Sequence, residues 1–254
     1  MAWFNSDGYV GTARNAGLTM PNPPNAQQAI EWNGYELRSY QGIPNHGPIE
    51  LSWQLRIKHA YAACVSYVDA QIGLLLDELQ RTKRLQNTLI ILLSDHGWHL
   101  GEQSAWSKMT NFEIATRVPL MISAPGISAG RTRTVSELVD VYPTICDFLD
   151  LPKPEHLQGE SLVAALREPN KQLDSVAFSQ YARFRGKYTG RAIRSDRFRY
   201  VEWRLTKTAK LQHSELYDHQ IDPHETNNIA NQSKSKGVVQ HLQRLLEANS
   251  APRR

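Results

Sequence analysis

Residues 89–102 read Leu-Ile-Ile-Leu-Leu-Ser-Asp-His-Gly-Trp-His-Leu-Gly-Glu, an apolar run that ends abruptly in a carboxylate, an imidazole and a glycine. An apolar run of this length, bounded by turn residues, predicts a buried strand of a parallel sheet. Ligands of open α/β sheets collect where the strands release their carboxyl ends. The sequence therefore places Asp95 and His96 at the edge of an active site, with Gly97 letting the backbone turn.

A long helix is predicted before this strand, and a second strand after it. From about Leu51 to the charged stretch 81–84, apolar residues recur at three- and four-residue steps, which is typical of an amphipathic helix. The apolar positions of this helix are Val65, Val68, Ile72, Leu75, Leu76 and Leu79. A second buried strand is predicted over 118–124. Asp140 can cap a helix whose first turn tolerates Pro143, and a short helix is expected near 162–166.

The pattern changes at about residue 175. Short strands are predicted over 176–181, 191–195, 198–204 and 214–217, followed by a helix over about 238–248, which indicates a small α+β subdomain. We therefore divide the chain into an irregular amino-terminal segment (1–48), a part of a catalytic α/β domain (49–174) and an α+β subdomain (175–254).

Composition is that of a globular protein. The chain has 254 residues, 41% of them hydrophobic, and a formal net charge of +4, which is too mild to imply nucleic acid. No apolar run approaches the roughly 20 residues of a membrane helix, and the first residues lack the basic start and apolar stretch of a signal peptide. The two cysteines, Cys64 and Cys146, form no disulfide framework and are expected to be buried.

Three motifs carry a resemblance to a known family. These are residues 94–102, the triplet Trp106-Ser107-Lys108, and residues 111–120. With them the chain resembles the sulfatases of the alkaline phosphatase superfamily, most closely the iduronate-2-sulfatase-like branch. The likeness extends upstream through 61–73 and downstream through 215–218 and 222–225, and covers most of the chain after about residue 45. It implies an α/β, alkaline phosphatase-like sandwich with a mixed, largely parallel sheet that is incomplete here, plus the small α+β subdomain.

The resemblance also implies roles for individual residues. Asp95 and His96 would be ligands of a divalent cation, calcium in this family, although each alone suits a local turn. Lys108 would contact a sulfate oxygen and stabilise developing negative charge, whereas a lysine judged alone is usually solvated. Trp98 and Trp106 would line a sugar subsite or anchor the loop, and both alternatives stay open. His99 is expected at the surface.

One family feature is missing. Sulfatases of this kind carry a Cys-x-Pro-x-Arg motif whose cysteine, or a serine in some members, becomes the formylglycine nucleophile, and neither Cys64 nor Cys146 fits that motif. The chain thus resembles the carboxyl-terminal portion of a sulfatase and is expected to be inactive alone.

The resemblance implies hydrolysis of sulfate esters of carbohydrates, with a sulfated carbohydrate as partner and neither nucleic acid nor membrane. A phosphoester or phosphonate hydrolase of the same superfamily, or a non-catalytic remnant that binds metal or anionic glycan, are the alternatives. Family members are usually exported; the location and oligomeric state of this chain stay open.

Two charged features have more than one interpretation. Glu113 and Arg117, four residues apart, are expected to form an orienting ion pair at the base of the pocket or an exposed pair of little effect. Residues 183–210 hold ten lysines and arginines. They are expected on the outward faces of short strands, or as a surface for sulfated glycans; a nucleic-acid surface fits least because no binding motif accompanies the charge.

Overall fold

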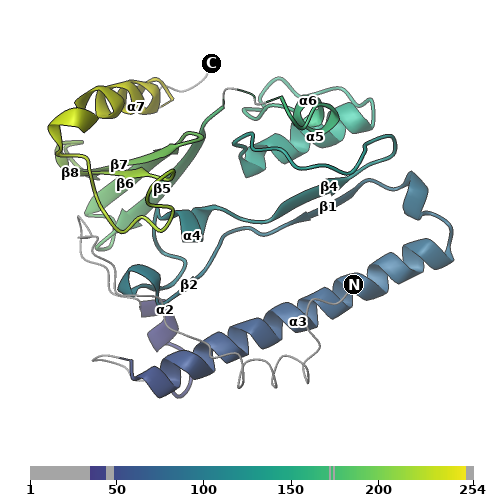
Figure 1. The fold of residues 1–254 in the computed structure, drawn as a ribbon, viewed down its shortest axis with the longest axis horizontal. Coiled ribbons are helices and arrows are strands. Elements are labelled where there is room, and N and C mark those ends of the chain that lie inside the picture. Colours follow the sequence, from purple (N-terminus) through teal and green to yellow (C-terminus); the bar gives the residue numbers. More distant parts are fainter. Residues whose placement is uncertain (1–34, 44–48, 172, 174, 250–254) are drawn as a thin grey trace.

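The computed structural model describes residues 35–43, 49–171, 173 and 175–249 (Figure 1). Most of the predicted irregular segment 1–48 therefore lies outside the described residues; within it, Tyr35–Arg38 form the short helix α2. The boundaries that we drew at residues 48 and 174 stay predictions.

Helix α3 (Leu51–Arg81) confirms the helix predicted from the apolar periodicity. The apolar residues of this helix are poorly covered by the rest of the chain. None of them is buried, since Ser66 is the one buried residue of α3, and Val68 and Leu75 are 54% and 69% exposed. Cys64, expected to be buried, is exposed on this helix, whereas Cys146 is buried. The periodicity thus predicted the helix but not the covering of its apolar side.

The strand predicted at residues 89–94 is β1 (Ile90–Leu93), and the one predicted at 118–124 is β4 (Leu120–Ser123). They pair with each other in antiparallel register, with Ile91 opposite Ile122, so the expectation that β1 is a buried parallel strand is wrong for this pair. In a parallel sheet, the helices that connect successive strands cover both faces of the sheet. Among the described residues β1 and β4 have only each other as strand neighbours, which leaves Leu93 and Met121 40% and 54% exposed.

Helices flank this pair. Figure 1 shows α3 along one side of β1 and β4, and α5 (Val141–Phe148) and α6 (Val163–Arg167) on the other. Asp140 precedes α5, but the predicted cap is not formed, because its side chain makes no hydrogen bond to the first turn of α5. It accepts instead the backbone N–H groups of Glu137 and Glu160 at 2.7 and 2.8 Å, outside that helix. Short 3₁₀ turns occur at Leu85–Asn87, Leu138–Asp140 and Ser233–Ser235. No helix in the described part of the chain is long and apolar enough to cross a membrane.

The segment after β1 contains β2 (His99–Leu100), a 3₁₀ turn (Glu102–Ser104), β3 (Trp106–Ser107) and α4 (Glu113–Thr116). β2 and β3 pair in antiparallel register. Trp106, Leu37 and Ile49 form a small buried cluster that joins this segment to α2 and to the start of α3.

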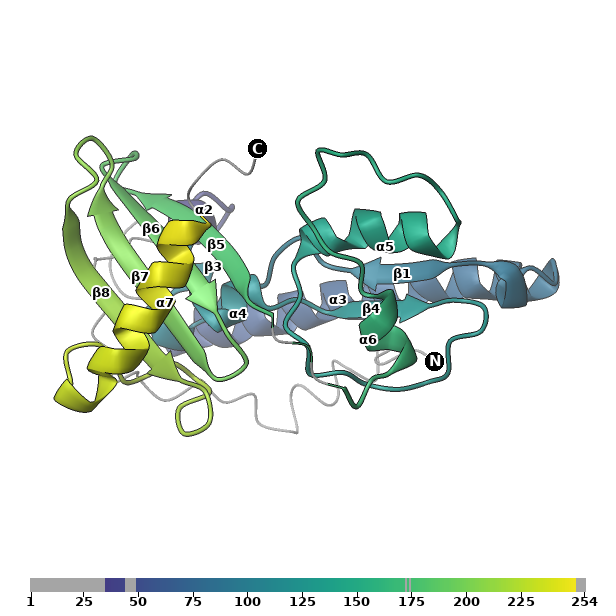
Figure 2. The same ribbon diagram turned by 90° about the horizontal axis from the view of Figure 1, so that it is seen from above.

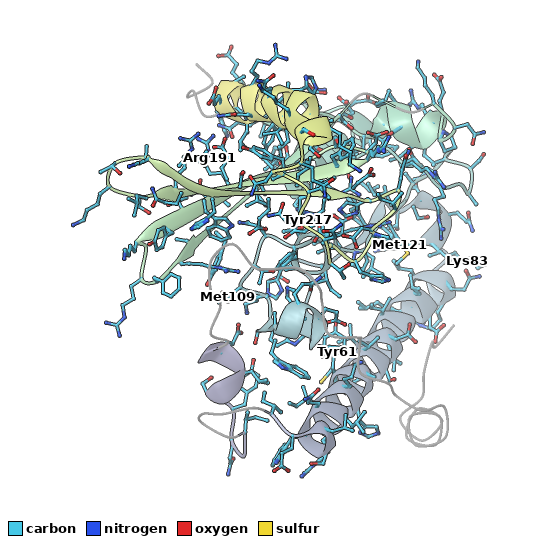
Figure 3. All side chains as sticks on the ribbon, turned by 60° about the vertical axis from the view of Figure 1, so that its left-hand side comes forward. Tyr61, Lys83, Met109, Met121, Arg191 and Tyr217 are labelled. Atoms are coloured by element: carbon cyan, nitrogen blue, oxygen red, sulfur yellow. The ribbon has the colours of Figure 1, made fainter. Side chains whose placement is uncertain are left out.

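The carboxyl-terminal part contains four strands followed by a helix, as predicted, and the strands form one antiparallel sheet. Strands β5 (Ala177–Arg183), β6 (Tyr188–Arg194), β7 (Phe198–Leu205) and β8 (Leu211–Asp218) lie in chain order. Helix α7 (Lys236–Ala248) crosses one face (Figure 2), with Ile193, Tyr200, Leu216, Leu242 and Leu246 as its core. Tyr217 lies on the face turned away from α7 (Figure 3), with its ring centroid 5.9 Å from that of Phe112 in the loop before α4.

Candidate functional site

Asp95 and His96 follow the carboxyl end of β1, where the sequence placed them. Asp95 accepts a hydrogen bond from the His96 backbone N–H at 2.9 Å, and its side chain is 83% exposed. His96 Nδ1 lies 2.9 Å from the Gly97 carbonyl oxygen, and His96 Nε2 lies 3.6 Å from Asp95 Oδ2. Because a carbonyl can only accept, we assign a proton to Nδ1. Nε2 then points toward the carboxylate of Asp95.

Gly97 is set by close packing rather than by a turn. Its N–H donates to the Ala115 carbonyl at 2.9 Å, and a Cβ on Gly97 would lie 1.9 Å from the Ile114 carbonyl oxygen. Gly97 is not among the glycines with positive φ, so the expectation that it lets the backbone turn is replaced by a steric reason. Any side chain here would push the Asp95–His96 loop away from α4.

Lys108 lies beside this loop and is bound by a carboxylate that the sequence did not point to. Its Nζ donates to Glu36 Oε1 of α2 at 2.8 Å and stands 5.5 Å from the centroid of the Trp98 ring. Trp98 in turn stacks on His96, with the ring centroids 6.2 Å apart. The hydrogen bond to Glu36 raises the pKa of Lys108, so its ammonium stays charged at neutral pH. The structure thus brings four of the five predicted site residues together and adds Glu36.

The burial of Trp106, the fifth, fits the alternative that it anchors the loop. Trp106 is 8% exposed and packs in the cluster with Leu37 and Ile49. Trp98 is the tryptophan that remains beside the polar groups.

His99, expected at the surface, is instead fully buried. Its Nε2 lies 2.7 Å from Thr110 Oγ1 and its Nδ1 lies 3.2 Å from the Glu102 carbonyl oxygen. Burial lowers the pKa of His99 to about 4, so the ring is neutral near pH 7. His99 lies in β2, and the pairing of β2 with β3 places its ring in the interior. The residues next to His99 in the sequence do not reveal this pairing, so its burial could not be predicted from them.

Glu113 forms the predicted pair with Arg117, in the form of the exposed-pair alternative, and it binds two other arginines more closely. Arg117 lies 3.8 Å away and is 79% exposed, whereas Arg194 donates to Glu113 at 2.9 Å and Arg199 donates to the same carboxylate. Arg199 also pairs with Glu225 at 2.5 Å, and Glu225 accepts the backbone N–H of Glu113 at 2.7 Å. The carboxyl-terminal sheet therefore holds α4, and α4 supports the loop of Asp95 and His96.

The same residues include a group of metal-ligand type. Glu113, His219 and Glu225 bring three such atoms within 4.8 Å of one another. Burial alone would raise the pKa of Glu113, but Arg199 and Arg194 outweigh it and lower it to about 2. Because these guanidinium groups already balance both carboxylates, we interpret the group as an ion-pair network. In the described residues it is the one cluster of three such side chains, so Asp95 and His96 supply two ligand groups.

Half of the ten basic residues in 183–210 pair with carboxylates of the fold. These five arginines (Arg191, Arg194, Arg197, Arg199 and Arg204) lie within 4.0 Å of a carboxylate. Arg183 and Arg199 are buried, so the expectation that this charge lies on outward faces is wrong for them. Such pairing reduces the charge available to a polyanion.

Comparisons with known proteins decide the family. The family model described as "Sulfatase" matches residues 7–151, and the model described as "N-sulphoglucosamine sulphohydrolase, C-terminal" matches residues 101–251. The chain belongs to the sulfatase family. An iduronate 2-sulfatase of Mus musculus is 30% identical over 87% of this chain and 54% of its own length. A choline-sulfatase of Rhizobium meliloti is 36% identical over 69% of this chain and 33% of its own length.

Solved structures agree. A structure in complex with its substrate D-glucosamine-2-N,6-O-disulfate superposes with a TM-score of 0.71 and 30% identity, over 78% of this chain and 41% of that one. A phosphonate monoester hydrolase from Silicibacter pomeroyi gives a TM-score of 0.72 and 26% identity, over 82% and 43% of the two chains. The expected alkaline phosphatase-like α/β fold is thereby confirmed. The chain spans between a third and about half of the curated sulfatases named above.

Proposed function

We propose that this chain contributes the carboxyl-terminal portion of a hydrolase that acts on sulfate esters of carbohydrates. The observation that carries this proposal is the gathering of Asp95, His96, Trp98 and Lys108 at the carboxyl end of β1. The family match supports the same chemistry. In this proposal Lys108 donates to a sulfate oxygen, and its fixed charge stabilises the negative charge that develops during cleavage. Trp98 offers an aromatic face to the apolar side of a sugar ring.

Asp95 and His96 are proposed as ligands of a divalent cation, calcium by analogy with the family. A carboxylate oxygen suits this hard cation, which when bound polarises the sulfate group. Two ligand groups are fewer than the six to eight oxygens that calcium takes, so we expect weak calcium binding or none by the chain alone. Submicromolar calcium binding that is lost in Asp95→Asn would contradict this expectation.

The proposed substrate class is a sulfated sugar, with a uronate 2-sulfate as the first compound to test. The relatives named above include an iduronate 2-sulfatase and a protein complexed with a disulfated glucosamine. A phosphonate or phosphate ester is the second candidate, because one structural neighbour is a phosphonate monoester hydrolase. Both substrates present a tetrahedral oxyanion to Lys108, so the sequence motifs do not separate them.

Ligand binding by the full chain tests this proposal. A sulfated monosaccharide should bind, and its unsulfated form and a phosphonate monoester should bind more weakly. Lys108→Ala should abolish the preference for sulfate. Lys153→Ala is the matched control, because Lys153 also pairs with a carboxylate, Asp147 at 2.7 Å, away from this group. Equal binding by Lys108→Ala and the unchanged chain would contradict the role of Lys108.

Catalysis gives a second test. Because neither cysteine lies in a Cys-x-Pro-x-Arg motif, covalent catalysis has no first step, and the chain should not hydrolyse an aryl sulfate above background. Metal-dependent turnover that Asp95→Ala abolishes would show that another nucleophile exists.

A further inference from the structure

Glu36 is the feature of the site that the proposed function leaves unexplained. Its carboxylate accepts a hydrogen bond from Lys108 Nζ at 2.8 Å, although 72 residues separate the two in sequence. The side chains of Glu36 and Lys108 are only 21% and 28% exposed. Leu37, the next residue in α2, is 2% exposed in the cluster with Trp106. The fold therefore holds Glu36 against Lys108.

The carboxylate stands where an anionic ligand of Lys108 would bind. One oxygen of Glu36 takes the ammonium, and the other, Oε2, is shielded from solvent and has no hydrogen-bond partner in the described part of the chain. Asp95 also acts on Lys108 as a nearby negative charge. The Glu36 carboxylate thus already neutralises the ammonium, and Asp95 adds negative charge nearby, so the group as it stands opposes the binding of an anion.

We propose that Glu36 is an internal competitor of the sulfate group, which must displace its carboxylate from Lys108 in order to bind. This inference rests on the proposed role of Lys108. A sulfate ester and the Glu36 carboxylate would both accept hydrogen bonds from the same ammonium, and two negative groups bound to one ammonium repel each other. Glu36 then lowers the affinity for sulfated ligands. If Glu36 only positioned Lys108, its loss would weaken binding instead.

Inorganic sulfate is the probe, titrated calorimetrically into the full chain at constant ionic strength, since salt screens such contacts. Glu36→Gln keeps the shape and removes the charge, and should tighten sulfate binding roughly five-fold, the scale of one partly exposed charge pair. Glu78→Gln is the matched control, because it removes the same charge and a pair with Arg81 at 2.6 Å on α3, and should leave the affinity unchanged. Adding Lys108→Ala to Glu36→Gln should abolish the gain.

Each result bears on one of the two proposals. Unchanged or weaker sulfate binding by Glu36→Gln, with binding lost in Lys108→Ala, would overturn the competition and keep the role of Lys108. A chain that binds no sulfate in any variant would overturn both. Glu36→Asp serves if circular dichroism shows that Glu36→Gln is misfolded. Its shorter side chain draws the carboxylate back from Nζ, so it should also tighten sulfate binding, and weaker binding would contradict the competition.

Discussion

At the scale of single residues, Gly97 shows how little room the loop of Asp95 and His96 has. Gly97→Ala would place a Cβ 1.9 Å from a backbone oxygen of α4, so the backbone must move. We expect the free energy of unfolding, measured in urea, to fall by roughly 1–3 kcal/mol. Gly73→Ala is the matched control: Gly73 lies in α3 with nothing within 4 Å of its added Cβ, and should gain roughly 0.5–1 kcal/mol. Equal effects of the two substitutions would refute the steric reason.

His99 predicts a dependence of stability on pH. Its pKa in the folded chain is lowered to about 4 from the ordinary value of 6.5, so unfolding takes up a proton between these two values. Above pH 6.5 the ring is neutral in both the folded and the unfolded chain, so its burial costs little stability. As the pH falls from 6.5 toward 4, only the unfolded chain binds the proton, and the free energy of unfolding decreases. We expect the free energy of unfolding to drop by roughly 2 kcal/mol between pH 7 and pH 5. His99→Gln should remove most of this drop, and the exposed His156→Gln should keep it. A drop that persists in His99→Gln would assign it to other groups.

At the scale of elements, local patterns in the sequence predicted where the helices and strands lie. They did not predict which elements pack or pair with one another. The periodicity over 51–81 predicted α3, and the short β-rich runs after residue 175 predicted the four strands β5–β8. The direction of β1 was missed, because it is decided by a partner strand 30 residues away rather than by the apolar run itself. Glu36 was missed for the same reason, since no local pattern links it to Lys108.

The ion-pair network around α4 is the element-scale feature that stability measurements can test. Glu225, 1% exposed, binds Arg199 and the first N–H of α4, so Glu225→Gln leaves a buried guanidinium with less charge to balance it. We expect a loss of roughly 3 kcal/mol in the free energy of unfolding, with faster hydrogen exchange at α4 and at Gly97. Glu247→Gln removes an exposed carboxylate that lies 4.0 Å from Arg204, and should change stability by less than about 0.5 kcal/mol. Unchanged exchange at Gly97 in Glu225→Gln would show that α4 does not transmit the support of the sheet.

At the scale of the whole molecule, the two halves of the described chain are covered unequally. The β5–β8 sheet has a helix on one face and a buried core with residues below 5% exposure. By contrast, α3 exposes Tyr67, Leu74 and Leu75 at 67%, 63% and 69%, and β1 and β4 each have one strand neighbour among the described strands. Exposed apolar surface and free strand edges both favour association. The exposed apolar side of α3 and the free edges of β1 and β4 therefore favour association of the chain with other molecules in solution.

We expect the purified chain to self-associate, because burying the apolar side of α3 against another molecule removes it from water. Size-exclusion chromatography over a range of concentrations, with thermal melting, measures this. Replacing Leu74 and Leu75 together by lysine should shift the chain toward monomer, since both side chains lie on the exposed part of α3. Ile221→Lys is the matched control: Ile221 is 75% exposed in a turn after β8, distant in sequence from α3, and should leave association unchanged. A monodisperse monomer with one cooperative transition in the unchanged chain would contradict the expectation, because it would mean that these 254 residues fold and stay soluble with α3 uncovered.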